Sequence, residues 1–433
     1  MKFNKSILSL LTLASSVAIF SCTDSTVDTD PCASSNCPTG YVCSNGDCIE
    51  VASSQVTKAG LLTANETWKA DKIYVLSGKV VVNDGVTLTI EPGTIIKGAQ
   101  GTGSLASALI VARGGKLMAE GTAEKPIIMT TIDDNIEIGQ TAGTNLDETI
   151  VGQWGGLIIL GKAPISASSG AEAQIEGIPA DDSYGAYGGS VSADNSGSIK
   201  YVSVRHGGAL IGDGNEINGI TLGGVGSGTI IENVEVIGNF DDGIEFFGGS
   251  VNVKNALVWA QGDDAYDIDQ SYSGTISNAI YIAGAESDHA FEIDGPEGTV
   301  NTTGMFTIKN FSCKGLSAEY MDWRDKAQGT IENCYFFNFN DKGDVELDDQ
   351  QEVNDNYLAG KIIISGNEFD LSVAGVTLDK IFKNTYSMGD DAAFKADMVA
   401  KNKSVTTKTA GIGADASVFS WTFASKKGAL TGF

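Results

Sequence analysis

Short segments in which apolar and acidic residues alternate recur through the middle of this 433-residue chain. The clearest copies lie at residues 244–247, 266–269 and 291–294, and looser copies follow at 321–324 and 345–348. A period of two residues is typical of a β-strand, because successive side chains point to opposite faces. We therefore expect strands whose apolar residues face a core and whose acidic residues face outward.

These segments can be aligned in a single register, which places equivalent residues in columns. One apolar column contains Ile244, Tyr266, Phe291, Met321 and Val345. A second contains Phe246, Ile268, Ile293, Trp323 and Leu347. The outward acidic column contains Glu245, Asp267, Glu292, Asp322 and Glu346, and Asp269 and Asp294 belong to the next. Such columns are expected when successive strands stack on one another in register.

A second series of strand-like segments has similar spacing and ends in asparagine. The asparagines are separated by 22 or 23 residues, apart from one interval of 32, and are Asn233, Asn255, Asn278, Asn310 and Asn333. Strands this short cannot bury an apolar face alone, but they can do so by stacking on the next repeat. The pattern predicts a solenoid. A stack of antiparallel β-sandwiches is the alternative, and it would favour alternation at a spacing of about 8–12 residues.

Two upstream segments indicate the kind of solenoid. Residues 90–98 (Ile-Glu-Pro-Gly-Thr-Ile-Ile-Lys-Gly) and 109–122 (Leu-Ile-Val-Ala-Arg-Gly-Gly-Lys-Leu-Met-Ala-Glu-Gly-Thr) resemble rungs of right-handed parallel β-helix proteins. Over residues 56–370 the arrangement resembles the pectin-lyase-like surface lipoproteins of Bacteroidetes. The resemblance implies an all-β chain with a right-handed parallel β-helix solenoid at residues 51–370.

The pattern changes after about residue 370. Residues 378–383 and 391–400 have helical spacing, and residues 418–423 have the alternation of a strand. A solenoid needs its open end covered, so we expect residues 371–433 to form a C-terminal cap.

The N-terminus has the features of a secretory signal. Lys2 and Lys5 precede an uncharged, apolar stretch, and Ser21-Cys22 ends it. Residues 6–21 are shorter than the roughly 20 residues of a membrane-spanning helix. Residues 1–21 therefore resemble a lipoprotein signal peptide, cut before a lipidated Cys22. The polar, acidic residues 22–31 form a tether and resemble a surface-export signal, which implies an outer-membrane protein anchored by lipid at the cell surface.

The remaining cysteines fall into two groups. Four lie close together within residues 32–50, which in an exported chain indicates a small module with two disulfides and three open pairings: Cys32, Cys37, Cys43 and Cys48. Cys313 and Cys334 lie in successive repeats but are offset by two residues. That offset exceeds the reach of a disulfide, so we expect both thiols to be free and buried.

The formal net charge of −27 excludes nucleic acid and anionic membrane surfaces as electrostatic partners. Stacked carboxylates about 4.8 Å apart repel unless cations, opposite charges or raised pKa values relieve them. Arg324 is expected to pair with Asp294 and Asp348 in its column. Calcium is the candidate cofactor for the others, Glu245, Asp267, Asp269, Glu292 and Asp294. A solvated acidic face with screened repulsion is the alternative.

A set of polar residues resembles the active site of polygalacturonase-type glycoside hydrolases. In chain order these are Asn239 with Asp241, Asp263 with Asp264, His289, and Arg324 with Lys326. The resemblance implies that Asp264 is the general acid, that Asp241 and Asp263 activate water, and that Arg324 and Lys326 bind a uronate carboxylate. His289 lacks the flanking glycines of that family, and the Asp-Asp pair also occurs at Asp241-Asp242, so these acids can equally follow from an acidic repeat.

Aromatic residues suggest a binding surface. Tyr184 and Tyr187 lie in a glycine-rich segment, residues 183–189, where they could stack on sugar rings. Trp154 is expected in packing and His206 in a turn. The function favoured by these observations is binding or adhesion to polysaccharide, matrix or other surface proteins. A polysaccharide-degrading hydrolase or lyase is the first alternative, and a structural accessory of an outer-membrane complex is the second.

Overall fold

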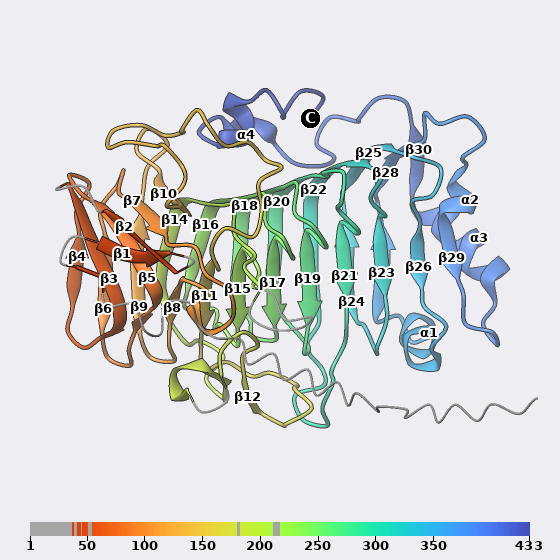
Figure 1. Cartoon of the computed structure of the whole chain (residues 1–433). Coiled ribbons are helices and arrows are strands. Elements are labelled where there is room, and N and C mark those ends of the chain that lie inside the picture. The colour runs from red at the N-terminus through yellow and green to blue at the C-terminus, as the bar shows by residue number, and fades with distance from the viewer. Residues whose placement is uncertain (1–36, 39–40, 45, 51–53, 180–181, 211–216) are drawn as a thin grey trace, which may run out of the picture.

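The computed structural model describes residues 37–38, 41–44, 46–50, 54–179, 182–210 and 217–433. The predicted signal peptide, the predicted lipidation site Cys22, the predicted tether and Cys32 lie outside these residues. The body is a parallel β-helix whose strands lie side by side from one end of the molecule to the other (Figure 1). The pairings between strands of the large sheet are parallel, which confirms the all-β solenoid and excludes the antiparallel sandwich alternative.

Each turn of the solenoid contributes to three stacked sheets. The first sheet carries the acidic columns and contains β8 (Ala108–Val111), β11 (Leu157–Leu160), β15 (Ile220–Gly223), β17 (Ile244–Phe247), β19 (Tyr266–Asp269), β21 (Phe291–Ile293), β23 (Met321–Trp323), β26 (Val345–Leu347) and β29 (Phe382–Asn384). The second contains β7 (Ile95–Gly98), β10 (Ile127–Thr131), β25 (Tyr335–Phe339), β28 (Glu368–Asp370) and β30 (Lys403–Val405). The third contains β4 (Glu66–Trp68), β6 (Thr87–Ile90), β9 (Lys116–Glu120), β24 (Gly329–Glu332) and β27 (Ile362–Ser365).

Long strands bend and pass from one sheet to another. Those that join the first and second sheets are β3 (Gln55–Leu62) and β5 (Ile73–Val82). Those that join the third and second are β14 (Gly197–Arg205), β16 (Ile230–Ile237), β18 (Asn252–Trp259), β20 (Thr275–Ile282) and β22 (Phe306–Leu316).

The repeated asparagines form the bend between the third and second sheets. Asn233, Asn255 and Asn278 have positive φ angles of 55°, 56° and 53°. Asparagine tolerates this left-handed conformation better than most residues. Its amide also extends the stacking, because Asn255 Nδ2 donates to Asn233 Oδ1 at 2.9 Å and Asn278 Nδ2 donates to Asn255 Oδ1 at 2.7 Å. Each sequence repeat that ends in asparagine therefore corresponds to one turn of the solenoid, with the asparagine at its bend.

The register of the first sheet reproduces the columns expected from the sequence. Ile244 lies opposite Tyr266, and Phe246 lies opposite Ile268. Both apolar columns are buried in one continuous core. The acidic column also aligns, since Glu245, Asp267 and Glu292 are successive partners. These carboxylates point out of the solenoid, as predicted.

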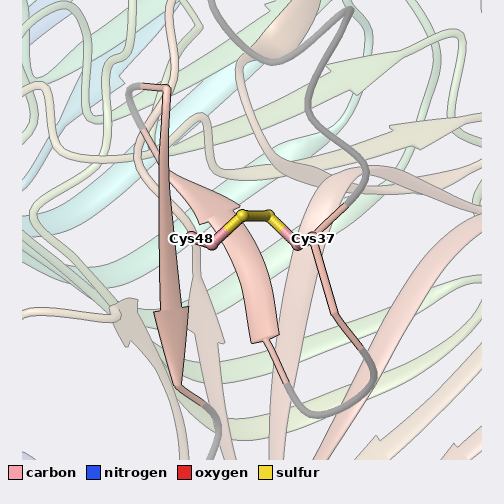
Figure 2. The surroundings of a disulfide bond; sticks show 2 residues. All are labelled: Cys37 and Cys48. Atoms are coloured by element: carbon pink, nitrogen blue, oxygen red, sulfur yellow. A yellow bond between two sulfur atoms is a disulfide. The ribbon is translucent and has the colours of Figure 1, made fainter.

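A small module with a disulfide precedes the solenoid. Its antiparallel hairpin pairs β1 (Tyr41–Ser44) with β2 (Asp47–Glu50). Cys37 and Cys48 form a disulfide with their Cα atoms 5.5 Å apart (Figure 2), and Cys43 is also disulfide-bonded. Cys313 and Cys334 are free and buried, as predicted from their offset.

The C-terminal region has two parts. Around the last rungs lie α1 (Gln351–Leu358), α2 (Leu378–Ile381) and α3 (Asp391–Lys401), of which α3 packs Phe394 against Phe382 of β29. The chain then returns along the second sheet as a strap, residues 412–433, which contains a 3-10 helix (Ala416–Phe419) and α4 (Phe423–Lys426) (Figure 1). Within the described part of the chain, none of the helices is long and apolar enough to cross a membrane.

The prediction of a strand at residues 418–423 is wrong. The buried carboxylate of Glu235 accepts hydrogen bonds from the backbone N–H groups of Phe423 and Ala424, at 3.0 and 2.9 Å, and Thr422 caps α4. Phe419 and Phe423 pack on the outer face of the second sheet. The apolar residues that suggested alternation are therefore buried by short helical turns on a surface that the local sequence does not reveal.

Candidate functional site

An insertion between β11 and β14 covers the C-terminal ends of several first-sheet strands. It contains β12 (Glu172–Gln174) and β13 (Ala186–Gly188). Tyr187 of this insertion is 2 % exposed, packs against Phe247, and donates a hydrogen bond to Gln270. Tyr184 is half-buried and donates to Asp182. The expected exposed pair of sugar-stacking tyrosines is therefore not formed, because Tyr187 closes the insertion over the sheet.

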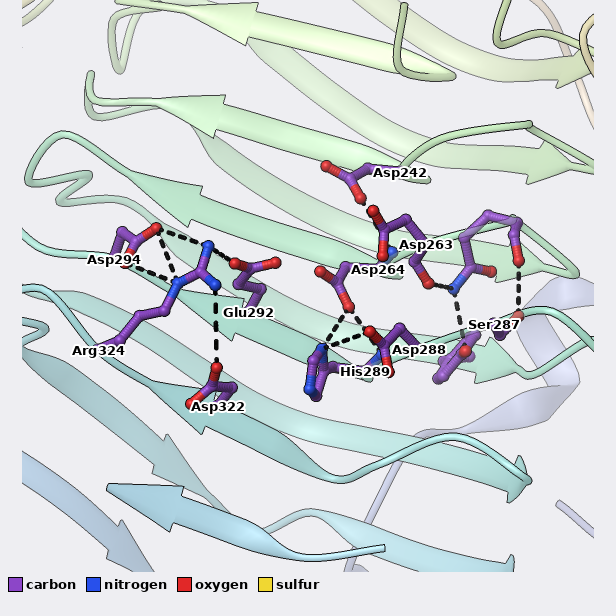
Figure 3. Close-up of polar contacts among 12 residues, drawn as sticks. Asp242, Asp263, Asp264, Ser287, Asp288, His289, Glu292, Asp294, Asp322 and Arg324 are labelled. Atoms are coloured by element: carbon purple, nitrogen blue, oxygen red, sulfur yellow. Dashed lines mark hydrogen bonds and ion pairs between the residues drawn. The ribbon is translucent and has the colours of Figure 1, made fainter. Parts of the chain in front are cut away.

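Polar residues link the N-terminal ends of the same first-sheet strands. Asp242 Oδ1 accepts a hydrogen bond from the backbone N–H of Asp264 at 2.9 Å. Asp264 Oδ1 in turn accepts from the backbone N–H of His289 at 2.7 Å and lies 2.9 Å from His289 Nδ1 (Figure 3). Asp264 is 1 % exposed. This geometry favours Asp264 as an acceptor that orients His289, instead of the proton donor that the resemblance implied.

His289 carries the positive charge of this arrangement. Burial alone would lower the pKa of His289, but the hydrogen bond and charge of Asp264, together with the charges of Asp288 and Asp322, raise it to about 9. The imidazole is therefore protonated at neutral pH, with Nδ1–H directed at Asp264.

Asp241, Asp242 and Asp263 bring carboxylate oxygens within 4.8 Å of one another beside this dyad. Burial and the charges of Asp264 and Asp288 raise the pKa of Asp263 to about 6. Burial also raises the pKa of Asp242, and the charge of Asp241 adds to this shift. Asn239 is buried and uses its amide to hold the turn, donating to the backbone carbonyls of Ile217 and Asp242.

A second group of carboxylates is more deeply covered. Asp242, Glu245 and Asp267 place one oxygen each within 4.8 Å of the others, and Glu245 is only 5 % exposed. Asn218 donates to Glu245, whereas Asp267 Oδ1 is buried and has no hydrogen-bond partner among the residues described. Burial raises the pKa values of both Glu245 and Asp267, and the charge of Asp267 adds to the shift of Glu245 whereas the charge of Asp269 adds to that of Asp267. Such an all-oxygen donor set fits a hard cation such as calcium.

Arg324 pairs with two of the three remaining acids that were predicted to bind a metal, Glu292 and Asp294, whereas burial and the charge of Glu297 raise the pKa of the third, Asp269, to about 6. Arg324 forms ion pairs with Glu292 and with Asp294 at 3.1 Å, and lies 4.0 Å from Asp322. The predicted pairing with Asp294 is confirmed, and Glu292 and Asp322 take the place expected for Asp348. The acidic columns thus divide into a carboxylate-only group around Glu245 and an arginine-paired group.

The positions of Arg324 and Lys326 differ from those implied by the hydrolase resemblance. Arg324 and Asp294 lie at one end of the polar network, and Asp263 lies away from them on the far side of Asp264 (Figure 3). Lys326 is exposed and donates to the backbone carbonyl of Pro296 at 3.3 Å. The structure therefore brings together Asp241, Asp263, Asp264 and His289 but does not place Lys326 with them.

A groove of about 1470 Å³ adjoins Asp241 and Asp263. It lies over the turns that lead from the second sheet to the first, and its lining includes Phe240, Trp259 and Leu316. Phe240 is 50 % exposed. The groove was not predicted from the sequence, although the apolar Phe240 within an otherwise polar turn is a signal that points to it.

Trp154 and His206 have structural roles. Trp154 is fully buried and donates from its indole N–H to the backbone carbonyl of Arg205 at 2.7 Å. His206 has a positive φ angle of 61° and its Nδ1 lies 2.8 Å from the backbone oxygen of Ile150. These contacts confirm the packing and turn roles expected for them.

We expect the melting temperature to fall as pH rises from 5 to 9 in metal-free buffer. Asp263, Asp322 and His289 have folded-state pKa values of about 6, 6 and 9, each above its ordinary value. The folded chain therefore binds protons more tightly than the unfolded chain, and the free energy of unfolding decreases with pH across this window. Calorimetry at constant ionic strength tests this, and Asp322→Asn should flatten the slope. A melting temperature that rises with pH would contradict it.

Comparison with known proteins agrees with this architecture. The family model described as pectate-lyase like beta helix domain matches residues 60–425. No curated protein and no solved structure gives a significant match to the chain. The matched region spans most of the solenoid and part of the strap, so the chain belongs to the family of pectate-lyase-like β-helix domains.

Proposed function

We propose that this chain is a surface lipoprotein that binds polysaccharide along the groove beside Asp241 and Asp263. The observation that carries the proposal is the groove itself, whose lining comes from turns of several successive rungs. A ligand in it would cross several turns of the solenoid, which suits a polymer better than a small metabolite. An exposed aromatic ring and neighbouring carboxylates supply the stacking and hydrogen-bond acceptors that sugars require.

The groove predicts that Phe240→Ala weakens glycan binding. Loss of the exposed ring should lower affinity at least about tenfold for any polysaccharide that the wild type binds. Val191 is also 50 % exposed but lies outside the groove lining, so Val191→Ala is the matched control. Affinity electrophoresis against a panel of soluble glycans measures both variants. Equal loss in the two variants, or no loss in either, would contradict the assignment.

The same glycans separate binding from degradation. The acceptor role of Asp264 and the ion pairs of Arg324 favour binding without turnover. In a reducing-sugar assay of the wild type and of Asp264→Asn, we expect no release from either protein. Release by the wild type that Asp264→Asn abolishes would instead make the chain a glycoside hydrolase.

We also propose that calcium occupies the group formed by Asp242, Glu245 and Asp267. Chelation should lower the melting temperature, and added calcium should restore it, because a ligand that binds only the folded state stabilises it. Asp267→Asn should raise the melting temperature in chelator and abolish the calcium response. Glu346→Gln, in the same column but outside the group, should retain it. A wild-type melting curve unaffected by chelator and calcium would contradict the proposal. Protons shared among the three carboxyl groups would then explain how their repulsion is relieved.

Lipidation at Cys22 is the remaining part of the proposal. The signal-like residues 1–21 and the acidic residues after Cys22 support an anchor at the outer membrane and exposure at the cell surface. Cys22→Ser should release the protein from the membrane fraction, and protease treatment of intact cells should digest the wild type. Retention of the variant in the outer-membrane fraction would place the anchor elsewhere.

A further inference from the structure

We infer that the groove selects a neutral, extended glycan and excludes polymers of uronic acids. The inference rests on the proposed function and deepens it by naming the class of ligand. It is carried by the charge of the groove lining, by the way Phe240 is held, and by the spacing of the rungs.

The charge of the lining opposes an acidic ligand. Four carboxylates line the groove, those of Glu148, Asp241, Asp263 and Glu286, against one cationic side chain, that of Lys314. The whole chain has a formal net charge of −27, which reinforces the same sign. A uronate polymer would bring further negative charge close to these groups, whereas the hydroxyls of a neutral sugar can donate hydrogen bonds to them.

The two cations to which the hydrolase resemblance gave uronate binding, Arg324 and Lys326, are engaged elsewhere. Arg324 pairs with Glu292 and Asp294, and Lys326 donates to Pro296. Neither belongs to the groove lining. The uronate-binding role that the sequence resemblance gave to Arg324 and Lys326 is therefore not available inside the groove.

Phe240 combines an exposed aromatic ring with a tightly packed backbone. A Cβ added to Gly208 would lie 2.3 Å from the backbone nitrogen of Phe240, and one added to Gly262 would lie 2.1 Å from its carbonyl oxygen. The neighbouring turns thus pack directly on the backbone of Phe240 while half of its surface stays open. Such a ring offers the C–H face of a pyranose a flat apolar contact at little cost in conformational entropy.

The carboxylates repeat at the spacing of the rungs. Asp241 and Asp263 occupy equivalent positions, each three residues before the paired residues Ile244 and Tyr266. Adjacent rungs are about 4.8 Å apart, and one pyranose residue of an extended β-linked chain advances by a similar distance. Consecutive sugars of a chain parallel to the solenoid axis can therefore meet equivalent acceptors.

Isothermal titration of the folded, lipid-free protein with soluble neutral β-glucan and with polygalacturonate tests the inference. At neutral pH and low salt, the neutral polymer should bind at least about tenfold more tightly. In Asp241→Asn/Asp263→Asn the ratio of uronate affinity to neutral affinity should rise at least about threefold. Phe240→Ala should weaken binding of the neutral polymer, and melting curves of each variant confirm folding.

The outcomes separate this inference from the proposed function. Equal or tighter binding of polygalacturonate would overturn the selection for neutral glycans and leave polysaccharide binding intact. Failure to bind either polymer or any member of a wider glycan panel would overturn both. An unchanged affinity ratio in the double variant would overturn the role of the groove carboxylates.

Discussion

The constraint on which this structure depends is the in-register stacking of one rung on the next. It places the same position of every repeat in a column with a spacing of about 4.8 Å, whatever side chain is there. Apolar columns built from residues such as Tyr266 and Phe291 become the core, and asparagine columns become hydrogen-bonded ladders. Acidic columns accumulate repulsion, which the protein must offset locally.

Each part of the acidic surface is compensated differently. Arg324 pairs with neighbouring carboxylates on the first sheet. Lys383 occupies the last position of the acidic column, opposite Glu346, and places a positive charge there. At the start of the strands, His289 supplies a positive charge that Asp264 maintains. Around Glu245 burial and the charges of neighbouring carboxylates raise the pKa values of the acids instead, and a bound cation would offset the same repulsion. The acidic columns are thus a set of separate polar sites that share one geometry.

Much of the fold was predictable because the repeat is encoded locally. The columns, the repeat positions of the asparagines and the free thiols of Cys313 and Cys334 follow from spacing alone. The burial of Tyr187 and the helical turns of residues 416–426 could not be predicted, since each depends on a surface formed by distant residues. The groove was not predicted for the same reason, since its lining residues come from several turns of the solenoid and from the strap.

The most direct test of the account is a crystal structure of the protein soaked with a neutral β-linked oligosaccharide. We expect a pyranose ring over Phe240, with the sugar chain parallel to the solenoid axis and its hydroxyls donating hydrogen bonds to Asp241 and Asp263. Oligosaccharide bound on the outer face of the first sheet around Arg324, with the groove unoccupied, would contradict it.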